Sequence, residues 1–197
     1  MDTRSIEKAG TRLAGVDIAL EQLSGDMPYK KFQALWNIFL TSWKSAYTIF
    51  EKGSKISGPS TEWFAAKKAE RLSDPLLKYL YEARNADEHG LEVPTEYHPG
   101  FVGIGVRGEG FSKGVMVNST ADGGMRFESI DGLPVLVREF APSAQLAPIV
   151  ARNSKSIAPP THHLGVALED KSPLNVARLA RDYLARMIEE ATALRSE

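Results

Sequence analysis

A stripe of aromatic side chains at helical spacing constrains the fold of this chain more than any other feature. Within residues 29–55, large apolar side chains recur every three or four positions: Phe32, Trp36, Phe39, Leu40, Trp43, Tyr47 and Phe50. That period places all of them on one face of an α-helix. A face this wide and aromatic has to be buried, so we interpret it as the core of a helical domain rather than as a cofactor site.

Two other segments have the same period and predict partners for this helix. Residues 6–23 carry a narrower stripe made of Ile6, Leu13, Val16, Leu20 and Leu23. Near the other end, Ser172 and Pro173 have the chemistry of a helix N-cap and first position. The apolar face that follows contains Val176, Leu179, Ala180, Tyr183, Leu184, Met187, Ile188 and Leu194. We expect this last helix to dock on the helices before residue 90 and close an up-and-down bundle.

Between these segments, a further helix is expected to begin near Ser60. Asp74 and Pro75 then provide a fresh N-cap and first helical position, which predicts either a new helix or a kink in the same one. Gly90 is a typical residue for the end of that helix.

The chain changes character after residue 94. Short β-branched runs near 101–106, 114–118, 124–129 and 134–139 are separated by glycine-rich turns, which predicts a small antiparallel meander. The sequence therefore predicts an α+β protein that is mainly a helical bundle. Residues 1–94 and 166–197 form the bundle, and residues 95–165 form a β-rich insertion.

Composition excludes several classes of protein. The 197 residues have a net charge of −1, and residues 1–90 carry 13 Lys/Arg against 12 Asp/Glu, so no segment is a generic basic arm for nucleic acid. Any RNA contact has to come from a local cluster of charge. The absence of cysteine excludes disulfides and thiolate metal sites. No apolar run reaches the length of a membrane span or a signal peptide, so a cytoplasmic location without membrane contact is expected.

The stretch "YEARNADEHG" at residues 81–90 carries the candidate chemistry. Arg84 is a permanently charged, bidentate ligand for phosphate. His89 exchanges protons near neutral pH, and the end of a helix favours its charged form. An acid–base histidine with a nearby arginine suits the transesterification of RNA, in which a 2′-hydroxyl attacks the adjacent phosphorus without a metal ion. Asn85 is placed to orient either group.

A simpler interpretation of the same stretch is structural. Arg84 and Glu88 are four residues apart and predict an ordinary surface ion pair within one helix. Positions five apart on a continuous helix are rotated by about 140°. Arg84 and His89 therefore cooperate only if the helix ends near His89 or if a second subunit completes the site.

The pattern Arg-Asn-x-x-x-His at the end of a bundle helix resembles the motif of HEPN domains, the higher eukaryotes and prokaryotes nucleotide-binding family. Arg84, Asn85 and His89 match that motif position by position. The resemblance covers about residues 1–90 and 172–197 and leaves the β-rich insertion unexplained. It implies a four- or five-helix up-down bundle that is usually a homodimer, with the motifs of two subunits meeting in a cleft.

Many HEPN domains are metal-independent ribonucleases of toxin–antitoxin and phage-defence systems, and others bind RNA or act as scaffolds without catalysis. The resemblance implies an endoribonuclease with Arg84, Asn85 and His89 as catalytic residues, RNA as the substrate, and no cofactor or metal. It also implies a homodimer and a protein partner such as an antitoxin. The alternative is a non-catalytic dimerisation module whose insertion binds a protein or a small ligand.

Two other patterns are weaker. "GIGVRG" at residues 103–108 has the glycine spacing of a dinucleotide-binding turn, but β-type residues follow it instead of a helix. His162 and His163 are adjacent in an extended segment, so their side chains point to opposite sides and do not chelate one metal together. A metal-dependent hydrolase that uses these histidines with His98 is the third interpretation.

Overall fold

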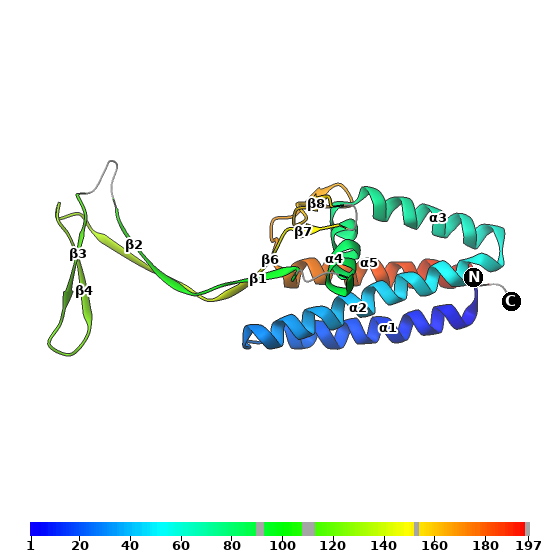
Figure 1. Ribbon diagram of the computed structural model, residues 1–197, viewed down its shortest axis with the longest axis horizontal. Helices are drawn as coiled ribbons and strands as arrows, with labels where there is room; N and C mark the ends of the chain where they lie inside the picture. Colours follow the sequence, from blue (N-terminus) through cyan, green and yellow to red (C-terminus); the bar gives the residue numbers. More distant parts are fainter. Residues whose placement is uncertain (90–92, 108–112, 152–153, 196–197) are drawn as a thin grey trace. The chain divides into compact units, whose positions relative to one another are not determined.

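The computed structural model describes residues 1–89, 93–107, 113–151 and 154–195, and within these it contains five α-helices and several short strands. The chain divides into two compact units (Figure 1). The helical unit consists of Met1–Glu96 and Ala144–Glu197, and the β unit consists of Tyr97–Ser143. The predicted α+β class is therefore confirmed. No helix in the described part of the chain has both the length and the apolar character that crossing a membrane requires.

The long helices of the helical unit are α1 (Thr3–Leu23), α2 (Tyr29–Gly53) and α5 (Pro173–Ala193). They lie side by side, and each packs against the other two (Figure 1). The aromatic stripe of α2 forms the centre of the core, because Trp36, Phe39, Trp43 and Phe50 are at most 1% exposed. The indole nitrogen of Trp43 also donates to the carbonyl of Ala180 at 3.1 Å, which joins α2 to α5. The sequence prediction of a buried stripe is confirmed.

Two shorter helices, α3 (Gly58–Ser73) and α4 (Pro75–His89), follow a single 3-10 turn at Ser54–Ile56. They are separate helices, because the Asp74 carboxylate accepts from the Leu77 backbone N–H at 2.8 Å and starts α4 afresh. In Figure 1, α4 is seen nearly end-on while the other helices run lengthwise, so α4 crosses them. The predicted helix stop at Gly90 lies outside the described residues.

Short strands after the β unit pack against α4. These are β6 (Ser143–Leu146), β7 (Ile149–Val150), β8 (Ser156–Ile157), β9 (His162–His163) and β10 (Val166–Ala167). The Tyr79 hydroxyl on α4 donates to the Ala147 carbonyl at 2.7 Å, and Ile149 is fully buried. Residues 144–165 therefore belong with the helices, whereas the sequence pattern grouped them with the insertion.

Strand β1 (Thr95–His98) pairs with β6 where the chain enters and leaves the β unit. Within that unit, β2 (Phe101–Val106) pairs antiparallel with β5 (Val135–Phe140), and β3 (Val115–Ser119) pairs with β4 (Met125–Ser129). The four strands lie within about a residue of their predicted positions. The predicted meander is wrong, because the β3–β4 hairpin is nested inside the β2–β5 pair. Residue alternation specifies which face a side chain occupies, and it does not specify the partner strand.

Candidate functional site

Helix α4 positions the predicted motif. One face of α4 is buried in the helical unit and consists of Leu76, Leu77, Tyr79, Leu80, Ala83 and Ala86. Arg84 and Asn85 lie at the edge of that face, half-buried, and their side chains reach toward α2. His89 is the last residue of α4, and its side chain lies outside the described part of the structure. The structure therefore places two of the three predicted site side chains.

Arg84 has carboxylate partners on its own helix. Its guanidinium lies 3.2 Å from the Glu88 carboxylate and 3.8 Å from that of Asp87. The expected i,i+4 ion pair is thus present. The Arg84 side chain is only 15% exposed, so these contacts are partly shielded from water, whereas the Glu88 side chain is 45% exposed. An arginine held this way is oriented while one side of its guanidinium stays near solvent.

Asn85 is held from both sides. Its amide oxygen accepts from the Lys44 ammonium on α2, and its amide nitrogen donates to the Glu82 carboxylate at 3.1 Å. Lys44 also lies 3.7 Å from Glu88 and over the ring of Tyr81. The arrangement therefore links the motif on α4 to a lysine on α2.

Helix α2 supplies the rest of the site, and sequence reasoning missed this contribution. Asn37 donates to the Asp87 carboxylate, and Thr41 donates to Asn37 at 3.2 Å. A signal was available in the sequence. Polar residues recur along α2 in steps of three or four beside the aromatic stripe: Asn37, Thr41, Lys44, Thr48 and Lys52.

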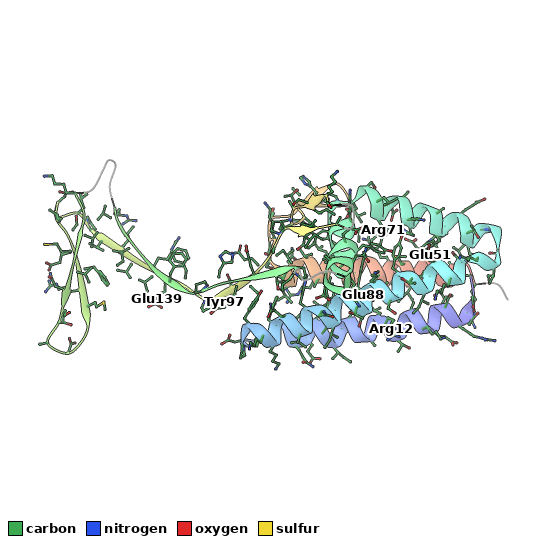
Figure 2. The ribbon with its side chains drawn as sticks, viewed as in Figure 1. Arg12, Glu51, Arg71, Glu88, Tyr97 and Glu139 are labelled. Atoms are coloured by element: carbon green, nitrogen blue, oxygen red, sulfur yellow. The ribbon has the colours of Figure 1, made fainter. Side chains whose placement is uncertain are left out.

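These side chains line one open groove, which we call the α2–α4 groove. It is lined by Thr41, Lys44, Ser45, Thr48, Ile49, Lys52, Arg84 and Glu88. Glu88, labelled in Figure 2, lies where α4 meets α2. Three cations and three hydroxyls face a single lining carboxylate, so the groove has the chemistry of a phosphate-binding surface. It is the kind of local basic cluster that the near-zero net charge of the chain requires for RNA contact.

The geometry of α4 separates Arg84 from His89 within one chain. The helix is continuous through His89, so the two Cα–Cβ directions differ by about 140° around the axis. A site that uses both residues on one phosphate is therefore incomplete in a single helical unit.

The structure also builds a buried Asp–His pair. His163 Nδ1 lies 3.2 Å from the Asp74 carboxylate, which additionally accepts from the backbone N–H groups of Leu77 at 2.8 Å and Leu164 at 2.6 Å. Burial alone would raise the pKa of Asp74, but the hydrogen bonds from His163 and the two backbone groups lower it. The pair connects the start of α4 to the β9–β10 turn, and the sequence held no signal for its long-range partner.

The adjacent histidines behave as predicted. His163 is buried and His162 is exposed, with its Nδ1 lying 3.0 Å from the Thr161 hydroxyl. Within the ranges that the structure describes, no three His, Asp or Glu side chains gather in a way that could hold a metal ion. Comparison with known proteins found no matching family model, no matching curated protein and no matching solved structure.

Proposed function

We propose that this chain is a HEPN-like endoribonuclease that acts as a homodimer, with the α2–α4 groove as its phosphate-binding surface. One observation carries the proposal: Arg84 of the motif shares a groove with Lys44 and Lys52 and with three hydroxyl side chains. Cations with neighbouring hydroxyl donors are the groups that hold the phosphates of RNA. The motif thus lies beside the one kind of surface that its proposed chemistry needs.

The proposed reaction assigns a role to each motif residue. Arg84 binds the non-bridging oxygens of the scissile phosphate, and Asn85 fixes Lys44 beside it. His89 takes the proton of the 2′-hydroxyl, whose oxygen then attacks phosphorus. The P–O5′ bond breaks, and the 5′-oxygen leaves with a proton. The products are a 2′,3′-cyclic phosphate and a 5′-hydroxyl, and no metal is involved.

The dimer is part of the proposal because α4 points Arg84 and His89 in different directions. In a homodimer, Arg84 of one subunit and His89 of the other converge on one phosphate. The expected partners are therefore RNA and a second copy, and an inhibitory protein partner is expected if the activity is toxic.

The direct test is RNA cleavage by the purified full chain in the presence of a chelator. The substrates are total RNA and tRNA, and cleavage is followed on a denaturing gel. We expect His89→Ala and Arg84→Ala each to lower the rate by about 10²–10³-fold. Arg12→Ala is the matched control, because Arg12 is an exposed arginine on α1 and should cleave like wild type. If wild type and His89→Ala are equally inert on every substrate, the enzymatic proposal fails.

A non-catalytic binding module is the second candidate, and a specific observation favours it. Arg84 and Asn85 already have partners, namely Glu88 and Asp87 for the arginine and Lys44 and Glu82 for the amide. On this account the motif stabilises the contact between α2 and α4. Arg84→Ala would then change stability or assembly while no cleavage is seen in any variant. A double-mutant cycle on Arg84 and Glu88 would give a coupling of about 0.3–0.5 kcal/mol, as for other helical ion pairs.

A further inference from the structure

The β2–β5 ribbon exposes one face that is almost entirely β-branched and apolar. In the antiparallel register, Val102 lies opposite Glu139, Ile104 opposite Val137, and Val106 opposite Val135. Residues directly opposite each other share a face, and side chains alternate along each strand. We call the face made of Val102, Ile104, Val106, Val135 and Val137 the valine face. Its only charged member is Glu139, labelled in Figure 2, near one end of the ribbon.

The opposite face of the ribbon covers itself. Phe101 and Phe140 stack with ring centroids 4.5 Å apart, and Arg138 lies over the Phe140 ring. A Cβ added at Gly103 would come within 2.9 Å of the Phe140 ring, so the glycine lets the ring lie against the strand. Within the described part of the chain, nothing comparable covers the valine face, where Val102 is 53% exposed and Val137 is 51% exposed.

A two-stranded ribbon of this kind needs a partner. Each sheet in the described part of the chain has only two strands, and an isolated pair of strands is at best marginally stable in water. The β unit also contributes no residue to the buried hydrophobic core, so it has no core of its own to stabilise it. An apolar face on such an element indicates a binding surface.

Charge and area indicate a second copy of this chain as the occupant. Residues 97–143 carry four Lys/Arg and five Asp/Glu, so the β unit neither attracts a polyanion nor repels its own copy. The valine face exposes on the order of 300 Å² of apolar surface, and Val117, Phe127 and Met125 add a second apolar face on β3–β4. Together these approach the roughly 450 Å² of apolar area that each partner contributes to a standard-size interface.

We propose that the β unit is a dimerisation arm whose valine face packs against the valine face of a second copy. The proposal is independent of RNA cleavage, since it concerns only the assembly of the β unit. If the proposed ribonuclease activity is also correct, the arm raises the effective concentration of the second subunit that the site requires. The two accounts fail separately, because assembly and cleavage are measured in different experiments.

Adjacent residues of β5 provide a matched pair for the test. Val137 lies on the valine face and Leu136 on the opposite face, and each is 51% exposed. Sedimentation equilibrium of the full chain, from about 1 to about 200 µM, should show a monomer–dimer equilibrium in the micromolar range. We expect Val137→Lys to raise the dissociation constant by about tenfold or more, and Leu136→Lys to leave it within about threefold of wild type.

A second measurement covers the case in which a lysine unfolds the ribbon. The chain has no cysteine, so Val137→Cys and Leu136→Cys each introduce a single thiol. A short bis-maleimide should cross-link Val137→Cys as a dimer and leave Leu136→Cys monomeric. Three outcomes overturn the proposal: a monomer at every concentration, a dimer that Val137→Lys leaves intact, or equal cross-linking of the two cysteine variants. The first would indicate that the valine face is covered within its own chain or by a different partner.

Discussion

Asp74 is the residue through which two distant segments of the helical unit meet. Its carboxylate is 5% exposed and accepts from three donors, one at the start of α4 and two in the β9–β10 segment. The sequence predicted its N-cap role from the following proline. The bonds to His163 and Leu164 span about 90 positions, and no local pattern predicts a contact at that separation.

Replacing Asp74 should therefore be costly. Asp74→Ala removes a helix cap and leaves buried donors unpaired, so we expect the free energy of unfolding at pH 7 to fall by about 2–4 kcal/mol. Urea denaturation followed by circular dichroism measures this. Asp26→Ala, at an exposed loop aspartate, is the control and should change it by less than about 0.5 kcal/mol. A loss from Asp74→Ala as small as that of the control would contradict the structure.

The same carboxylate predicts a pH dependence. Its folded-state pKa is lowered, so its stabilisation is fully present above the unfolded pKa of about 3.9 and is lost as the pH falls toward the folded value. The stability difference between wild type and Asp74→Asn should therefore hold near pH 5 and shrink below about pH 4. A difference that grows as the pH is lowered through this range would have the wrong sign.

Arg71 is a buried cation held by aromatic rings. It is 6% exposed, and its guanidinium carbon lies 3.8 Å from the ring centroid of Tyr81 and 5.4 Å from that of Tyr47. Burial raises the pKa of Tyr47, and Arg71 offsets part of that rise. Among the described residues, no carboxylate comes within ion-pair distance of Arg71.

Because the contact depends on a flat, weakly hydrated group, lysine should replace Arg71 poorly. We expect Arg71→Lys to lower the free energy of unfolding by about 1–2 kcal/mol, and by more than Arg71→Met does. Denaturation of both variants side by side is the measurement. A lysine variant that is clearly the more stable of the two would show that the charge matters more than the stacking.

At the scale of elements, helix α2 determines the helical unit. Its buried aromatic stripe follows from spacing alone, because burial of a helix face has a period that the sequence displays directly. Its polar side, which lines the α2–α4 groove, was not predicted. Polar residues at helical spacing are usually only solvated, and which of them face α4 depends on how the two helices cross.

Neighbouring positions on α2 test this division. Phe39 is fully buried and Ile38 is 50% exposed. Phe39→Ala should lower the free energy of unfolding by about 3–5 kcal/mol, and Ile38→Ala by less than about 1 kcal/mol. Chemical denaturation of the two variants provides the comparison, and equal losses would mean that α2 is rotated relative to the structure described here.

At the scale of the whole molecule, the chain consists of a helical unit that contains the described core and a β unit outside it. Because β1 and β6 pair at the junction, replacing residues 99–142 with a short glycine-rich turn should leave the helical unit folded. We expect its thermal unfolding to stay cooperative, with a midpoint within about 5 °C of the full chain. A loss of cooperative unfolding would show that the β unit is needed for the helical fold.

The candidate site was only partly predictable from the sequence. The motif and its likely ion pair were local features within six residues, so spacing was sufficient to find Arg84, Asn85 and Glu88. Lys44 and Lys52 join them because α2 and α4 cross, and that crossing is a property of the packed core. The β strands were located by alternation, while their nested pairing depends on contacts over more than 30 residues.

The central claim is that Arg84 and His89 cleave RNA by attack of the 2′-hydroxyl, and the termini of the products test it most directly. The full chain is incubated with a short RNA in the presence of a chelator, beside the same RNA with 2′-deoxyribose at the cleavage position. We predict a 2′,3′-cyclic phosphate and a 5′-hydroxyl from the first substrate, no cleavage of the second, and none by His89→Ala. Cleavage of the deoxy substrate at the same bond, or wild-type activity in His89→Ala, would contradict the account.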